Sequence, residues 1–392
     1  MPNYNSIKET DDKYVMNTYK RFPVEVVSGK GSLVFDPSGK RYIDLGSGIG
    51  VTSFGIADEV WQEAIKKQIG TLQHMSNLYY TEPCGKLAQL LCEKTGMSKV
   101  FFSNSGAESN ECAIKAARKY AADHKGDEYF TIVTLQNSFH GRTITTLSAT
   151  GQEHYHELFK PLTPGFVHAV PGDMDDLKRL CKEYKTAAIM IECVQGEGGV
   201  IPLSKEYVTA AAAFAKENDI LLMVDEVQTG NGRTGEFYAY MNYGIRPDIV
   251  STAKGLAGGL PLGATLFSEK TASALGYGEH ASTFGGNPVC CAAAISIVSR
   301  IDDALLADVR EKSRMIFETF TGAEGVEDVS GLGLMIGIKT KKPAADVLAY
   351  CMEHGVLCLT AKDRIRLLPA LNIPRDILAE GLSVILEGCR QD

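Results

Sequence analysis

Short apolar runs recur through the first three quarters of the chain, and stretches with helical spacing separate them. The runs are KVFFSNSG, YFTIVTL, AAIMIECV, ILLMVDE, DIVSTAKG and LGATLFS. Their length and β-branched content are typical of strands that are buried on both faces of a largely parallel sheet. Between two of them, ESNECAIKAARKYAADH places small or aromatic side chains on adjoining faces of one helix: Cys112, Ala113, Ala116, Ala117 and Tyr120.

The alternation predicts a layered α/β domain over residues 46–286. From about Asn287 the pattern changes to helical stretches around the strand-like segments GLGLMIGIKT, GVLCLT and IRLLPAL. We expect residues 287–392 to form a smaller α+β domain together with residues 1–45, which contain SLVFDPSGKRYIDL.

The composition narrows the class of protein. The 392 residues are 44% hydrophobic and 22% charged, and the net charge of -8 argues against a nucleic-acid partner. The chain has no apolar run of about 18 residues and a polar N-terminus, so we expect no membrane span, no secretory signal and a cytoplasmic location. The ten cysteines include no C-x-x-C and are expected to be mostly buried free thiols. The HYH segment at 154–156 lacks a nearby third ligand, so no metal site is expected.

One carboxylate stands at the end of the most hydrophobic run. In ILLMVDEVQTGNGRTG, Asp225 follows five apolar residues, and burying its charge there is costly unless a cationic group meets it. A helix N-cap after a strand is the alternative explanation.

Two further segments carry candidate binding groups. In FFSNSGAESNECAIKAAR a strand ends and a helix starts around Ser105, Gly106 and Ala107, which suits an anion site or a plain helix cap. In NSFHGRTITT, Phe139 and Arg142 suit a stacking surface and a carboxylate clamp, or a surface arginine beside a packed ring.

A lysine completes the set. In DIVSTAKGLAGG, Lys254 follows a strand among glycines, where desolvation would lower its pKa and make it a nucleophile; a solvated lysine is the alternative. An anion seat, a buried aspartate and a strand-end lysine 29 positions after it are the groups needed to hold pyridoxal 5'-phosphate. The lysine would form the imine, the helix N-terminus would take the phosphate, and Asp225 would keep the ring nitrogen protonated.

The motifs resemble those of the class III (ω-type) aminotransferases, within the fold type I pyridoxal-phosphate-dependent transferases. The segments that carry the resemblance span the chain: GKGSLVFDPSGKRYIDLGSGIGV, HMSNLYY, FFSNSGAESNECAIKAARKY, FHGRT, IECVQGEGG, DEVQTGNGRTG, RPDIVSTAKGLAGGLPLGA, STFGGNP and IRLLPAL. Within the class they most resemble the acetylornithine aminotransferases. The resemblance implies an α/β large domain with a mainly parallel sheet, a smaller α+β domain, and ping-pong transfer of the δ-amino group of N-acetylornithine to 2-oxoglutarate.

The resemblance also implies roles for individual residues around the cofactor. Lys254 resembles the Schiff-base lysine and proton shuttle, and Asp225 the partner of the pyridine nitrogen. Gln228 resembles the residue beside the ring hydroxyl, and Phe139 the stacking aromatic. The phosphate seat corresponds to Ser105, Gly106 and Ala107, with Thr283 supplied by the neighbouring subunit of a homodimer with shared sites.

A second group of residues resembles the substrate contacts. Arg142 corresponds to the clamp for the substrate α-carboxylate, and Ser282 to a contact from the neighbouring subunit. Glu197 resembles a gate that pairs with Arg366 until glutamate or 2-oxoglutarate binds. Tyr19 is expected to line the far end of the pocket.

Two positions depart from the patterns of relatives. Cys193 stands where the family usually has proline, which leaves the chemistry intact but could shift the end of the strand. Ile49 stands where ornithine aminotransferases usually carry tyrosine, and this favours an acylated α-amine.

Several alternatives stay open from the residues. Ornithine, succinylornithine and 4-aminobutyrate aminotransferases and an aminomutase use the same groups. A nicotinamide-dependent dehydrogenase is suggested only by GLGLMIG, whose spacing and following IGIKT differ from the dinucleotide fingerprint. A non-catalytic role would leave Lys254 and Asp225 without a use.

Overall fold

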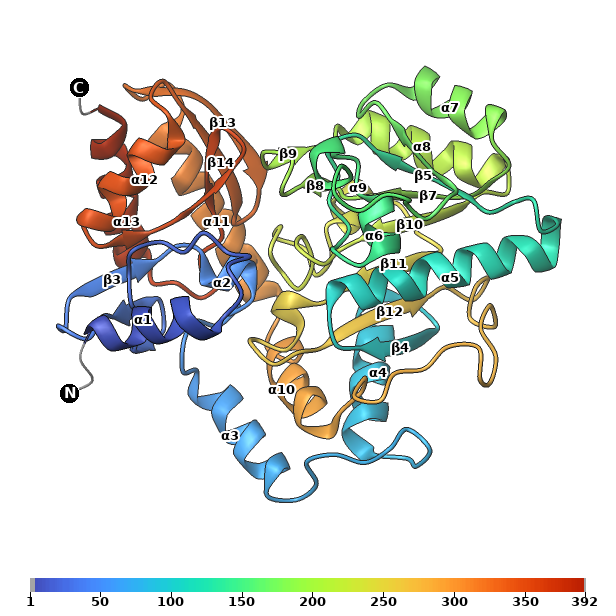
Figure 1. The fold of residues 1–392 in the computed structure, drawn as a ribbon, viewed down its shortest axis with the longest axis horizontal. Coiled ribbons are helices and arrows are strands. Elements are labelled where there is room, and N and C mark those ends of the chain that lie inside the picture. Colours follow the sequence, from blue (N-terminus) through green and yellow to red (C-terminus); the bar gives the residue numbers. More distant parts are fainter. Residues whose placement is uncertain (1–3, 391–392) are drawn as a thin grey trace.

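A seven-stranded sheet forms the centre of the larger part of the molecule in a computed structural model that describes residues 4–390 (Figure 1). Its order is β4 (Lys99–Ser103), β12 (Gly263–Phe267), β11 (Ile249–Thr252), β10 (Leu221–Asp225), β7 (Thr186–Ile191), β5 (Thr131–Leu135) and β6 (Phe166–Ala169). β12 runs antiparallel to both of its neighbours, and the other neighbouring pairs are parallel. The prediction of a mainly parallel sheet is confirmed; all six predicted strands belong to it, and β6 was not predicted.

Both faces of this sheet are covered, and alternate residues of each central strand point to opposite sides. Leu221 and Met223 of β10 pack with Cys112 and Ala116 of α5 (Gly106–Lys125). Leu222 and Val224 join the larger cluster on the other face, which α4 (Glu82–Thr95), α7 (Met174–Glu183), α8 (Lys205–Glu217) and α10 (Pro288–Val298) complete. Burial of both faces is the reason that the strands are continuous apolar runs in the sequence.

A second part of the molecule combines the two ends of the chain (Figure 1). β3 (Arg41–Asp44) pairs in parallel with β15 (Val356–Leu357), in a sheet of order β1 (Ser28–Lys30), β2 (Leu33–Phe35), β3 and β15. Another sheet has the order β13 (Val326–Leu332), β14 (Met335–Thr340), β17 (Arg364–Leu367) and β16 (Leu359–Ala361). Ile43, Ile336 and Leu382 share a buried cluster that unites these segments. The division at residues 46 and 286 stays a prediction.

The GLGLMIG segment comprises the end of β13, a two-residue turn and the start of β14, and the two strands are antiparallel. Gly333 occupies the turn with φ +59, and an added Cβ there would lie 2.4 Å from the carbonyl oxygen of Arg233. Since a strand and not a helix follows these glycines, the segment does not form a dinucleotide-binding loop.

The remaining elements connect and cover the sheets. They are α1 (Tyr4–Tyr14), α2 (Ser47–Gly50), α3 (Glu59–Ile69), α6 (Ile144–Ala149), η1 (Glu153–Tyr155), β8 (Val194–Gln195), β9 (Ile201–Pro202), α9 (Tyr240–Tyr243), η2 (Lys254–Leu256), α11 (Asp303–Phe320), α12 (Ala344–Glu353) and α13 (Arg375–Arg390). Across residues 4–390, no helix is long and apolar enough to cross a membrane. Seven of the ten cysteines are buried and all ten are free thiols, as expected.

A buried glutamate organises the long loop that follows β10. Glu226 is 0% exposed, and its two carboxylate oxygens accept hydrogen bonds from Thr229 Oγ1 at 2.6 Å and from the backbone N–H of Tyr240 at 2.9 Å. Burial raises the pKa of Glu226 from 4.5 to about 7 against the opposing effect of these hydrogen bonds.

We expect Glu226→Gln to change how stability depends on pH. The pKa of Glu226 is higher in the folded than in the unfolded chain, so its ionisation disfavours folding as the pH rises from 4.5 to about 7. The variant lacks that effect, and its free energy of unfolding relative to the wild type should increase by about 2.5 kcal/mol between pH 5 and pH 8. Urea unfolding of both proteins at the two pH values measures it. A difference that is independent of pH would contradict the explanation.

Candidate active site

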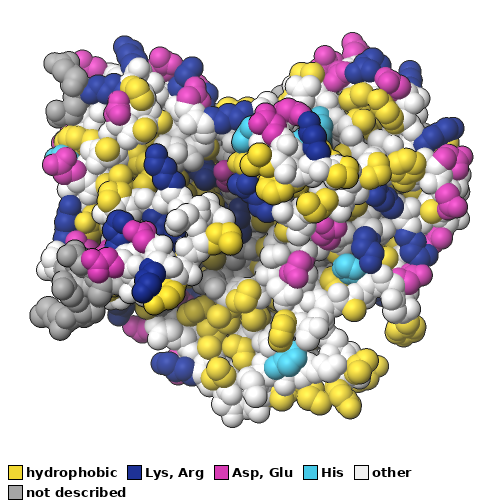
Figure 2. All heavy atoms as spheres, in the orientation of Figure 1, with side chains coloured by type: hydrophobic (Ala, Val, Ile, Leu, Met, Phe, Trp, Pro, Cys, Tyr) yellow, Lys and Arg dark blue, Asp and Glu magenta, His cyan; other side chains and the backbone are white. Residues whose placement is uncertain are grey.

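The carboxyl ends of the parallel strands open into a cavity of about 610 Å³. Figure 2 shows the surface hollowed between the part that carries both chain ends and the part that carries the seven-stranded sheet, with Lys and Arg side chains along the hollow. Because parallel strands present their carboxyl ends at one edge, residues far apart in the sequence converge here. Nine of the expected site residues line the cavity: Tyr19, Ser105, Gly106, Ala107, Phe139, Arg142, Asp225, Gln228 and Lys254.

Asp225 ends β10 and is 4% exposed. Its Oδ2 accepts hydrogen bonds from His140 Nδ1 and Asn110 Nδ2, each at 2.8 Å, and its Oδ1 accepts one from the N–H of Val227 at 2.9 Å. Burial acts to lower the pKa of His140, but the hydrogen bond and the charge of Asp225 outweigh it and raise that pKa. Asp225 is no helix cap, because no helix begins between it and Tyr240 in the described chain.

Glu192 repeats this pattern on the neighbouring strand. It follows β7 directly, is 5% exposed and accepts a hydrogen bond from the N–H of Phe139 at 2.9 Å. Burial raises the pKa of Glu192 to about 8, and the charge of Asp225 adds to this against the opposing charge of His140. A carboxyl group therefore fixes the backbone that carries the Phe139 ring.

The N-terminus of α5 forms another wall of the cavity. The Ser105 side chain caps the helix by accepting from the N–H of Glu108 at 3.2 Å, and the first N–H groups of a helix have no partner within it. The backbone approaches closely here, because a Cβ at Gly106 would lie 2.6 Å from Val227 Cγ1. Gly106 and Ala107 thus line the cavity at the end of the helix that favours anions.

Lys254 begins η2, two residues after β11, and its φ of 45° lies in the left-handed region. L-residues seldom adopt this conformation, and such strain is concentrated at functional sites. Burial lowers the pKa of Lys254; Glu197 opposes this effect and Arg366 adds to it. The lysine is therefore closer to its neutral, nucleophilic form than a solvated lysine.

Glu197 and Arg366 form an ion pair beside the cavity. Gln228 joins them, because its Oε1 accepts from Arg366 Nη1 at 3.4 Å and its Nε2 donates to Glu197 Oε1 at 3.4 Å. Burial acts to raise the pKa of Glu197, but the charge and hydrogen bond of Arg366 outweigh it and lower that pKa. Arg366 is 4% exposed and comes from β17, so this pair joins the two parts of the molecule.

The remaining expected residues lie at the margins. Tyr19 lines the cavity although it is 74% exposed. Ser282 Oγ accepts a hydrogen bond from Asn104 Nδ2 at 3.1 Å, whereas Thr283 lines a neighbouring cavity of about 630 Å³. The structure therefore does not bring Thr283 to the Lys254 site of its own chain.

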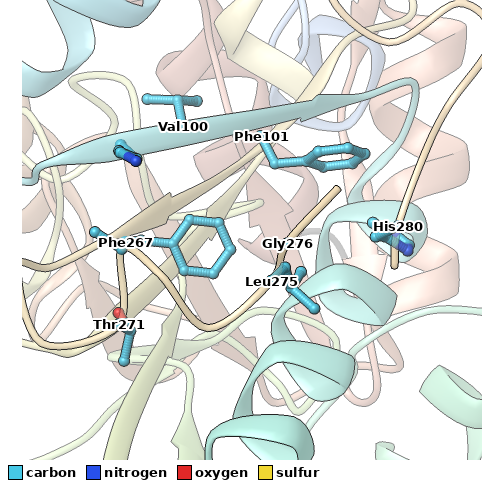
Figure 3. A pocket seen from close by; sticks show the side chains of 9 residues that line it. Val100, Phe101, Phe267, Thr271, Leu275, Gly276 and His280 are labelled. Atoms are coloured by element: carbon cyan, nitrogen blue, oxygen red, sulfur yellow. The ribbon is translucent and has the colours of Figure 1, made fainter. Parts of the chain in front are cut away.

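A smaller cavity lies apart from these residues (Figure 3). It measures about 170 Å³, and Phe101 of β4, Phe267 of β12 and Leu275 surround it. Its lining includes none of the expected site residues.

From the sequence, no role was assigned to three buried polar side chains of the site: Asn110, His140 and Glu192. A signal existed for two of them, because Glu192 ends the apolar run AAIMIE as Asp225 ends ILLMVD, and Asn110 interrupts the small-residue face of α5. His140 gave no periodic signal, since its partner lies 85 positions away.

A mainly parallel sheet whose carboxyl edge carries a buried aspartate, a lysine and a helix N-terminus defines the fold type I class of pyridoxal-phosphate-dependent enzymes. The model of the family described as aminotransferase class-III matches residues 14–387. The chain belongs to this family, and it is a pyridoxal-phosphate-dependent aminotransferase.

Individual relatives agree with the family. An acetylornithine aminotransferase from Haemophilus ducreyi is 46% identical over 98% of both chains. The structure of an ornithine aminotransferase from Toxoplasma gondii ME49 superposes with a TM-score of 0.94 at 28% identity, covering 99% of this chain and 95% of that one. The structure of an N-acetylornithine aminotransferase from Stenotrophomonas maltophilia K279a gives 0.82 at 32% identity, covering 94% and 96%.

The cavity fits the cofactor chemically. Asn110 Oδ1 and His140 Nε2 are buried without a hydrogen-bond partner in the described chain, and both residues line the cavity, so polar atoms beside Asp225 are left unsatisfied. The absence of a side chain at Gly106 leaves room where the helix N-terminus meets Val227. An acidic group, a lysine and an anion seat match the ring nitrogen, the aldehyde and the phosphate of pyridoxal phosphate.

We expect Gly106→Ala to weaken cofactor binding about tenfold or more. The new Cβ would overlap Val227, and the displacement would disturb the N–H groups beside the phosphate. The measurement is the dissociation constant for pyridoxal phosphate from its absorption after dialysis and titration. Gly85→Ala on α4 is the control, since a Cβ there meets nothing within 4 Å. Equal affinities in the two variants would refute the assignment of the phosphate seat.

Proposed function

We propose that the protein transfers the δ-amino group of N2-acetyl-L-ornithine to 2-oxoglutarate, giving N-acetylglutamate 5-semialdehyde and L-glutamate. The relatives named acetylornithine aminotransferase, which match nearly the whole chain, support this substrate. The reaction would belong to arginine biosynthesis in the cytoplasm.

The observation that carries the proposal is that one of the two arginines near Lys254 is paired with a carboxylate and the other is not. Arg366 is paired with Glu197, whereas Arg142 has neither an ion pair nor a hydrogen bond among residues 4–390. A substrate with one carboxylate needs one free arginine, and a dicarboxylate such as 2-oxoglutarate needs two. One cavity could therefore accept both substrates in turn.

Lys254 and Asp225 act on the cofactor in this proposal. Pyridoxal phosphate, when bound, supplies an electron sink that makes a proton next to the substrate nitrogen acidic. Asp225, fixed by His140 and Asn110, holds the proton at the ring nitrogen. Lys254 would bind the cofactor aldehyde and would move the proton between the amine-bearing carbon of the substrate and the carbon that carries the cofactor aldehyde, for which its lowered pKa suits it.

The other residues hold the ring and its phosphate. Phe139 stacks on the ring, Gln228 contacts its hydroxyl, and Ser105, Gly106 and Ala107 receive the phosphate. The place of all five on the wall of one cavity supports these roles.

Arg142 and Arg366 bind the carboxylates of the substrates. Arg142 binds the α-carboxylate of N-acetylornithine, so that the distal amine points toward Lys254, and Tyr19 closes the far end. In the second half-reaction Glu197 moves away and Arg366 binds the α-carboxylate of glutamate or 2-oxoglutarate.

The acyl group is accommodated near Ile49. This residue lies in a left-handed turn in which Ser47, Gly48, Ile49 and Gly50 all have positive φ, between 46° and 72°. Ile49 is 41% exposed and offers no hydrogen bond to a free α-ammonium, which favours an acylated amine over ornithine. Succinylornithine and 4-aminobutyrate remain alternative donors, and dependence of turnover on 2-oxoglutarate excludes an aminomutase.

We further propose a homodimer with shared active sites. Thr283 contacts the phosphate of the neighbouring subunit and Ser282 its substrate. Exposed apolar side chains near the Ser282–Thr283 loop support an interface there: Leu78, Tyr79, Tyr80 and Phe284. Asn77 ties the first segment to the loop by donating to the carbonyl oxygens of Ser282 and Gly285 at 3.0 and 2.8 Å.

Lys254→Ala should abolish glutamate formation from N-acetylornithine and 2-oxoglutarate and remove the visible absorption of the lysine-bound cofactor. The control is Lys270→Ala, which removes a lysine that pairs with Asp219. A persistent lysine-bound absorption band in the Lys254 variant would mean that another lysine binds the cofactor.

Arg366→Ala should slow the half-reaction with glutamate about 100-fold or more and change the half-reaction with N-acetylornithine far less, because only the former uses the freed guanidinium. Stopped-flow absorption of each half-reaction measures this. Arg364→Ala is the matched control, since Arg364 lies on the same strand and pairs with Asp328 at 2.8 Å. Equal losses in both half-reactions would rule out the switch.

A further inference from the structure

Arg142 is held by aromatic faces and not by an acid. Its guanidinium carbon lies 4.2 Å from the centre of the Tyr155 ring and 5.4 Å from that of Phe139. The two rings meet edge to face at 5.8 Å with an interplanar angle of 70°. No carboxylate pairs with this guanidinium within residues 4–390, so its charge is not neutralised before substrate arrives.

This kind of contact suits an arginine that must bind a carboxylate. An aromatic ring attracts the planar cation through its face and leaves the N–H groups at the edge available for a bidentate acceptor. An acidic neighbour would use the same N–H groups and would have to be displaced, as Glu197 must be from Arg366. The ring thus limits the motion of the Arg142 side chain and leaves the N–H groups of its guanidinium available for the substrate carboxylate.

The backbone on both sides of Tyr155 is firmly anchored. Its N–H donates to the carbonyl oxygen of Gln152 at 3.1 Å, and Gln152 Nε2 donates to that of Ser138 at 3.1 Å. On the other side, His156 is 4% exposed, and its Nε2 lies 2.9 Å from the carbonyl oxygen of Leu147 and 2.7 Å from that of Thr150. The Tyr155 ring therefore rests on the same framework that carries Phe139.

Tyr155 does not line the cavity, whereas Phe139 and Arg142 do. Its effect on substrate must therefore act through the two cavity residues that it contacts, Arg142 and Phe139. Phe139 already has a place against the cofactor in the proposed function, so Tyr155 is the ring that is left to orient the guanidinium.

We propose that Tyr155 is a positioning residue that orients Arg142 for the carboxylate of the amino donor. This deepens the proposed function and rests on its assignment of Arg142 as the carboxylate clamp. The aromatic ring carries the effect, and its hydroxyl does not.

The test uses the holoenzyme and the half-reaction with the amino donor. Tyr155→Leu should raise the half-saturating concentration of N-acetylornithine about fivefold while the limiting rate and the cofactor spectrum stay unchanged. Tyr155→Phe keeps the ring and should match the wild type within about twofold.

A donor without a carboxylate separates positioning from structural damage. With N-acetyl-1,4-diaminobutane, which lacks only that group, Tyr155→Leu should behave like the wild type. Equal losses with both donors, or a Tyr155→Phe variant as impaired as Tyr155→Leu, would overturn the proposal.

Arg142→Ala separates failure of this inference from failure of the proposed function. If Arg142→Ala leaves the half-saturating concentration of N-acetylornithine unchanged, the clamp itself is misassigned. If Arg142→Ala raises it and Tyr155→Leu does not, only the role of Tyr155 fails. In the Arg142→Ala background, Tyr155→Leu should add no further loss, because the two changes remove one interaction.

Discussion

The burial of the Asp225 charge is the constraint on which the site depends. A carboxylate at the end of a central strand loses its hydration, and the fold compensates with three hydrogen bonds from His140, Asn110 and the Val227 amide. These donors come from a loop, a helix and the chain after the strand. The elements that surround the cavity are therefore positioned against one another through a single charged group.

The ionisable groups around Asp225 have pKa values that are shifted in different directions. Glu192 is buried and its pKa is raised, Lys254 has a lowered pKa, and Glu197 stays ionised beside Arg366. Burial shifts the pKa of Glu192 and of Lys254 toward the neutral form, whereas the charge and hydrogen bond of Arg366 outweigh burial at Glu197. A cavity with such groups can exchange protons near neutral pH, which the chemistry of an aminotransferase requires.

The fold was predictable where burial leaves a pattern in the chain. Six strands of the central sheet were recognised because they contain short apolar runs, most of whose positions are buried. β6 was missed because only Ala169 of its four residues is fully buried, so it leaves little apolar pattern. The expected site residues could be named from the resemblance to aminotransferases. Asn110 and Glu192 could have been found only by treating a polar residue within or at the end of an apolar pattern as a sign of function.

The sequence by itself determined the class of the fold, the candidate lysine and aspartate, and the family. This information lies in hydrophobic periodicity and in local motifs, because both are properties of residues that are close together in the sequence. Only the tertiary structure decided that His140 meets Asp225, that Glu192 accepts a hydrogen bond from the Phe139 amide, and that Tyr155 lies against Arg142. These are contacts between separate elements, and their geometry is fixed only when the elements pack together.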